Sequence, residues 1–100
     1  LAAPAVAQSR IRMTIVTGGT GGVFYPYGGG LAKILSEKVP NVQATAQVTG
    51  GSVDNAKLVH AGEAEIGFAT LDSAYDAMMG VGAYAKDGKQ DVRVLAVLYD

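Results

Sequence analysis

The sequence contains no cysteine, and its single histidine is His60. The absence of cysteine excludes a thiol nucleophile, a disulfide framework and a cysteine-ligated metal. One histidine without a cluster of carboxylates is also too little for a metal site or an acid–base pair, so His60 is expected to be a solvated surface residue. We therefore predict no catalytic residue, no metal and no cofactor, and a protein that is not an enzyme.

Positive charge is also sparse. The formal net charge is -1, and the eight lysines and arginines are scattered along the 100 residues. Binding to a phosphate backbone needs a basic stripe, so we expect no nucleic-acid partner. No apolar run approaches the ~20 residues that a membrane-spanning helix needs, so the chain is not expected to span a membrane itself.

The first residues differ in composition from the rest of the chain. Residues 1–7 read LAAPAVA, and Ala5-Val6-Ala7 matches the small-x-small pattern that precedes a signal-peptidase cut. An ordinary alanine-rich arm is the alternative interpretation. The pattern predicts that residues 1–7 are a signal-peptide remnant and that residues 8–100 are the exported part.

Strand and helix patterns alternate along residues 8–100. Short apolar or alternating runs predict strands, and apolar residues at helical spacing between them predict helices. The strands are expected at residues 10–17, 42–48, 64–69 and 92–99, and the helices at 23–38, 52–61 and 73–79. Regular alternation of this kind predicts an α/β fold with a mainly parallel sheet flanked by helices.

Three turns rich in glycine or small polar residues each follow a predicted strand and lead into a helix. They are residues 18–24, 49–52 and 70–73, with Ser52 expected to cap the second helix. The carboxyl ends of parallel strands lie at one edge of the sheet, where ligands bind. Free N–H groups and the positive dipole end of a helix favour an anion there, and no basic side chain is expected nearby. The turns therefore suit a small anion or zwitterion better than a polyphosphate.

The glycines do not fit a nucleotide fingerprint. Gly19-Thr20-Gly21 is followed by Phe24 where a dinucleotide motif needs its third glycine. A P-loop needs Gly-Lys before Ser or Thr, whereas Gly88-Lys89 precedes Gln90. An oxidoreductase or transferase that holds a phosphorylated cofactor at the glycine turn remains the competing hypothesis, and a sensory or scaffold module is a third.

Three sequence blocks resemble one family of binding proteins. They are TGGTGGVFYP, VTGGSVDN and GEAEIGF with a following aspartate, in that order along residues 11–100. With these blocks the chain looks like the start of a TAXI-type solute-binding protein. Such proteins are the extracytoplasmic receptor subunits of tripartite ATP-independent periplasmic (TRAP) transporters.

This resemblance implies a type II periplasmic-binding-protein-like fold in which two α/β lobes hold the ligand between them. Residues 8–100 would form the first lobe, truncated at its C-terminal end, and so only part of a two-lobed protein. The implied location is the periplasm. The implied partners are a small carboxylate or amino acid, such as glutamate, glutamine or a related organic acid, and the membrane permease subunits.

The ligand-binding positions carried over by motif match lie in the same three turns. They are Gly19, Thr20, Gly21, Gly22, Val23, Phe24, Tyr25, Thr49, Gly50, Gly51, Ser52, Asn55, Thr70, Asp72 and Ser73. Tyr25 is the expected side-chain contact, and residues 28–30 are expected to let the first helix pack closely on the sheet. Similar proteins often carry glutamine where this chain has Thr70. Because threonine has the shorter reach, the identity of the ligand is not carried over.

Overall fold

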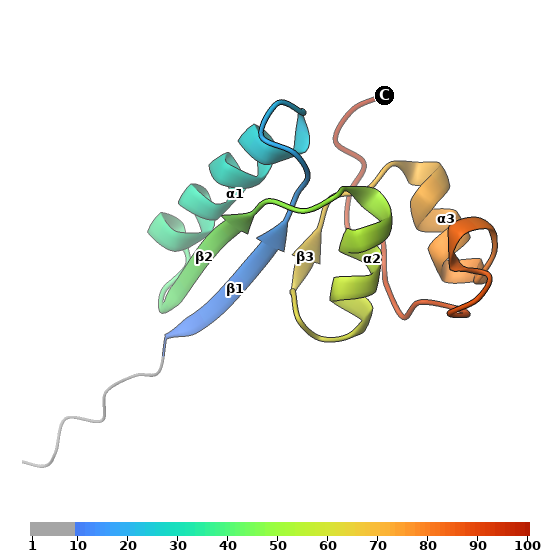
Figure 1. Ribbon diagram of the computed structural model, residues 1–100. Helices are drawn as coiled ribbons and strands as arrows, with labels where there is room; N and C mark the ends of the chain where they lie inside the picture. Colours follow the sequence, from blue (N-terminus) through green and yellow to red (C-terminus); the bar gives the residue numbers. More distant parts are fainter. Residues whose placement is uncertain (1–9) are drawn as a thin grey trace, which may run out of the picture.

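The computed structural model describes residues 10–100, and the predicted signal-peptide remnant lies outside them. Strands and helices alternate, as predicted (Figure 1). The elements are β1 (Ile11–Val16), α1 (Phe24–Lys38), β2 (Val42–Gln47), α2 (Ser52–His60), β3 (Ile66–Gly67), α3 (Leu71–Met79) and a 3-10 helix at Gly82–Tyr84. None of the helices within residues 10–100 has the length and apolar composition needed to span a bilayer.

The three strands form one parallel sheet in the order β2-β1-β3. β1 pairs with β2 along its whole length, whereas β3 pairs only with Ile15 and Val16. Half-buried residues alternate with exposed ones along β2, as its sequence predicts. The sheet confirms the predicted α/β class.

The strand order also places a topological switch point in the sheet. The chain leaves β1 through α1 toward β2 on one side, and α2 then leads to β3 on the other side. Because such crossovers are right-handed, α1 and α2 cover opposite faces of the sheet (Figure 1). The two crossover connections therefore run in opposite directions across the sheet, and the switch point lies between β1 and β3. Open α/β sheets bind ligands at such a point.

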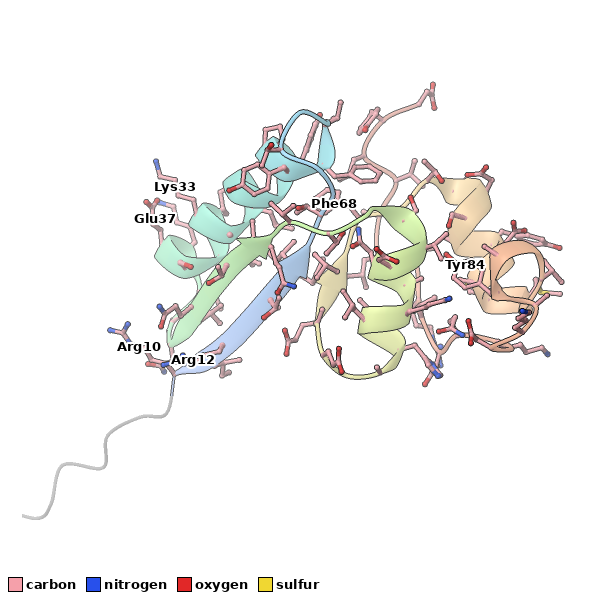
Figure 2. The ribbon with its side chains drawn as sticks, viewed as in Figure 1. Arg10, Arg12, Lys33, Glu37, Phe68 and Tyr84 are labelled. Carbon is pink, nitrogen blue, oxygen red and sulfur yellow. The ribbon has the colours of Figure 1, made fainter. Side chains whose placement is uncertain are left out.

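Two apolar clusters hold the helices in place. Ile15, Ala32 and Phe68 form the first cluster, between α1 and the sheet. Ala56, Ala77 and Tyr84 form the second, which joins α2 to α3. Figure 2 shows Phe68 and Tyr84 in these separate places.

One of the three glycines in α1 allows a close approach to the sheet. A Cβ on Gly28 would stand 2.3 Å from Thr17 Cγ2, whereas Gly29 and Gly30 would meet no atom within 4 Å. The prediction that residues 28–30 permit close packing is therefore right for Gly28 and wrong for its two neighbours.

The predicted strand at residues 92–99 is absent. This segment forms no strand, and within residues 10–100 its backbone donates one hydrogen bond, from Val92 to Gln90. Strand structure needs a neighbouring backbone, and no ladder joins the segment to β3, whose two residues pair with β1 alone. Apolar side chains such as Leu95 and Val97 are exposed as a result. Apolar, β-branched composition predicts a strand here but does not supply its partner.

Candidate functional site

Three helices begin at the edge of the sheet where the strands end. Their N-caps are Val23, Gly51 and Thr70, and none of these residues makes a side-chain capping hydrogen bond. Ser52 was expected to cap α2, but it is the first helical residue, and Gly51 stands at the cap. Uncapped N-termini keep free N–H donors and a positive dipole end facing outward. This edge of the sheet therefore presents N–H donors and helix dipole ends of the kind that favour an anion.

A small pocket lies at this edge. It has a volume of about 330 Å³ and includes five of the predicted site residues, Gly19, Gly22, Val23, Phe24 and Gly51. Two further residues line it that were not among the predicted contacts, Gly18 and Tyr99. Gly18 could have been found from its place directly after the strand. Nothing in the sequence signals that Tyr99 reaches a turn so distant along the chain.

The first turn presents free backbone donors. The N–H groups of Gly19, Thr20 and Gly21 donate no hydrogen bond within residues 10–100, while Gly22 donates to the carbonyl oxygen of Gly19 at 3.0 Å. All four residues are exposed. A Cβ on Gly19 or Gly21 would meet no atom within 4 Å, so a ligand can come close to these amides. The first turn therefore presents three consecutive N–H groups that donate no hydrogen bond within residues 10–100.

The second turn uses its donors internally. Gly50 N–H donates to Asp54 Oδ2 at 3.1 Å, and Gly51 N–H donates to Thr49 Oγ1 at 3.1 Å. The hydroxyl of Thr49 in turn donates to Asn55 Oδ1. Gly51 contributes backbone surface to the pocket, but its N–H group is already bonded.

The third turn is tied to the second turn and to the 3-10 helix at Gly82–Tyr84. Thr70 N–H donates to Ser52 Oγ at 3.0 Å, and Ser73 Oγ lies 2.8 Å from the hydroxyl of buried Tyr84. Two hydrogen bonds lower the pKa of the exposed Asp72 carboxyl. The larger effect comes from the Thr70 side chain and the smaller from the Ser73 N–H. None of these predicted site residues lines the small pocket.

Asn55 is buried beneath the three turns. It is 1% exposed, and its Nδ2 group donates to the carbonyl oxygens of Thr17 and Phe68. Both N–H donors of the side chain are therefore occupied. Asn55 was predicted as a ligand contact, and its place in the fold connects it to strand ends instead.

Aromatic side chains run from the core to the pocket. The ring centroid of Phe68 lies 5.5 Å from that of Phe24 and 6.5 Å from that of Tyr27. Tyr27 then stacks on Tyr99, with ring centroids 5.5 Å apart. Tyr25, the predicted side-chain contact, is exposed and does not line the small pocket. The aromatic wall thus comes from Phe24 and Tyr99.

A larger apolar cavity of about 580 Å³ lies beside the small pocket. Phe24 and Tyr99 line both spaces, and the larger one extends between β3, α2 and residues 92–100. Predicted site residues Asn55 and Thr70 are among its lining residues.

Among residues 10–100, no basic side chain lines the small pocket. Arg10 and Arg12 lie at the opposite end of β1 from the glycine turn, and Lys33 points outward from α1 (Figure 2). Two carboxylates lie close to these turns: Asp54 in the first turn of α2, which accepts from Gly50, and Asp72 in the third turn. Any anion in the pocket would be held by backbone N–H groups and helix dipoles.

An α/β unit of this kind, with a pocket between the turns that lead into α1 and α2, is compatible with part of a periplasmic-binding-like lobe. The model of the NMT1-like family matches residues 15–100, and the chain belongs to that family. Its members are periplasmic-binding-like proteins and are generally binders and receptors. The family therefore indicates a general role in solute binding, and the competing enzyme hypothesis is not favoured.

Proposed function

We propose that the protein is an extracytoplasmic solute receptor of a TRAP transporter that captures a small carboxylate in the periplasm and delivers it to the permease. The observation that carries the proposal is the first turn, where the N–H groups of Gly19, Thr20 and Gly21 have no acceptor within residues 10–100 and stand beside an uncapped helix. Free amides at a helix N-terminus bind carboxylates without a basic side chain. The TAXI-like sequence blocks supply the transport role.

The charges around the pocket favour an amino acid among carboxylates. Asp54 and Asp72 place negative charge at the second and third turns. A dicarboxylate without an ammonium group would bring only like charge to these turns, whereas the ammonium group of an amino acid would be attracted to them. Glutamine and glutamate fit this pattern, as does a related amino acid of similar size.

The proposed mechanism is closure of two lobes around the solute. Residues 8–100 would form the first lobe and present the glycine turn to the carboxylate. A solute that contacts both lobes stabilises the closed state, which the permease then recognises.

Calorimetry with the full-length protein, both lobes included, tests the proposal. The panel contains glutamine, glutamate, succinate, NADH and ATP, and we expect heat from one or both amino acids. A Gly19→Leu variant should bind roughly tenfold or more weakly, equivalent to about 1.4 kcal/mol, because the new side chain covers the free amides. Its melting temperature should stay close to that of the wild type, since a Cβ at Gly19 meets no atom within 4 Å.

The matched control is Gly29→Leu. Gly29 is exposed on α1, and a Cβ there also meets no atom within 4 Å, but Gly29 lies outside the small pocket. This variant should bind as the wild type does. Binding of the nucleotides alone, or equal affinities in the Gly19→Leu and wild-type proteins, would refute the proposal.

A further inference from the structure

Asn55 lies where β1 and β3 stop pairing. The β1–β3 ladder contains the pairs Ile15↔Ile66 and Val16↔Gly67. Beyond these pairs the two strands lead into different turns. The next carbonyl groups, those of Thr17 and Phe68, would lack ladder partners at this point. Asn55 Nδ2 donates to both of them, which replaces the missing rungs with one side chain.

The third hydrogen bond of Asn55 reaches the end of β2. Thr49, which follows that strand, donates its hydroxyl to Asn55 Oδ1 and accepts the N–H of Gly51 at 3.1 Å. The orientation of the amide is fixed by this chemistry, because two carbonyl acceptors require the NH₂ group and a hydroxyl donor suits the oxygen. A single buried side chain thus bonds to the ends of all three strands.

We propose that Asn55 is a positioning residue for the solute site, which it holds in shape without touching the solute. Both of its N–H donors are occupied and the side chain is 1% exposed, so it has no donor to offer a carboxylate. What it controls is the separation of the first and second turns, since Gly18 and Gly51 both line the small pocket. As a statement about solute binding, the inference rests on the proposed function.

Two substitutions at Thr49 test the network gently, with Asn55→Ala as the stronger variant. Thr49→Val removes the hydroxyl and both of its hydrogen bonds, while Thr49→Ser keeps them. Amide hydrogen exchange followed by NMR reads the strand ends directly. The reporters are the N–H groups of Thr49, bonded to Gly18 O at 3.3 Å, and Phe68, bonded to Val16 O at 3.0 Å.

We expect both reporters to exchange roughly tenfold faster in Thr49→Val and in Asn55→Ala, and at the wild-type rate in Thr49→Ser. Met13, inside the β1–β2 ladder opposite Ala44, should be unchanged. Unchanged reporters, or equal acceleration at Met13, would overturn the inference, because the second result describes a general loss of stability. If Asn55→Ala does not fold, the Thr49 pair decides.

The same variants are then titrated with glutamine and glutamate at a temperature where each is fully folded. Affinity should fall roughly threefold to tenfold in Thr49→Val and return in Thr49→Ser. Wild-type affinity in Thr49→Val would overturn the positioning role, as would binding lost in Asn55→Ala but retained in Thr49→Val, which indicates direct contact. If the wild-type protein binds neither amino acid nor succinate, the proposed function fails, and the exchange rates still decide whether Asn55 positions the turns.

Discussion

The turns after β1 and β2 are both rich in glycine, and both lead into a helix, but their backbones behave differently. In the first turn, the N–H groups of Gly19, Thr20 and Gly21 donate to no acceptor in the described part of the chain. In the second, Gly50 and Gly51 donate theirs to side chains of the same segment. A glycine-rich sequence therefore does not by itself indicate a binding surface, because the side chains around it decide whether the amides are available.

The glycines of the two turns have different physical roles as well. Gly51 has φ +120° and ψ -152°, a conformation that side chains disfavour strongly. Gly19 and Gly21 have ordinary φ values and open space where a Cβ would stand. The first turn needs glycine for access, and the second needs it for its backbone conformation.

The largest loss of stability is expected from Gly28→Ala, because Gly28 packs against Thr17, the residue directly before the first turn. The added Cβ would stand 2.3 Å from Thr17 Cγ2, directly before that turn. Overpacking of this kind lowers the free energy of unfolding by about 1–3 kcal/mol. Urea denaturation measures the change.

A second substitution shows whether the clash is the cause. Thr17→Ser removes the methyl group but keeps the hydroxyl that bonds to Gln47 O, so stability lost in Gly28→Ala should largely return in the double variant. Gly29→Ala, with no atom near its Cβ, should raise stability by about 0.5–1 kcal/mol through better helix propensity. No rescue in the double variant would locate the strain elsewhere.

The next largest effect compares the same change in the two turns. Gly51→Ala forces a side chain into a disfavoured conformation and should lower the free energy of unfolding by about 1–2 kcal/mol. Gly21→Ala should change it by less than about 0.5 kcal/mol. Thermal or chemical unfolding of both variants gives the answer, and equal losses would remove the distinction drawn between the turns.

The sequence predicts the local part of this structure well. The α1 helix and the alternation in β2 both follow from short-range patterns. The coincidence of the three turns at one edge follows from the parallel topology. Each of these features depends on neighbours in the chain or on a general rule of sheet connection.

Long-range partners account for what the sequence does not predict. Residues 92–99 have a strand-like composition but no ladder to join. Asn55 looks like a ligand contact until the carbonyl groups of Thr17 and Phe68 are seen to occupy it. Tyr99 reaches the first turn through its stack on Tyr27. In all three cases the deciding contact is with a residue distant in the sequence.

The smallest expected effect concerns Asp72 in the third turn. Replacing it tests what a charged side chain contributes to stability at this edge, whereas the glycine variants test the backbone. The pKa of this carboxyl is lowered from its ordinary value of 3.8, chiefly by the Thr70 side chain and then by the Ser73 N–H. A depressed pKa in the folded state contributes stability above pH 3.8, and this contribution is lost as the pH falls through the folded value.

Asp72→Asn should therefore be slightly less stable than the wild type at pH 6, with the difference disappearing below the folded pKa. Unfolding curves between pH 6 and pH 2 measure it, with Glu37→Gln at the far end of α1 as the control (Figure 2). Because Asp72 is exposed, the effect is small, and a difference that grows on acidification would show that the carboxylate destabilises the turn instead.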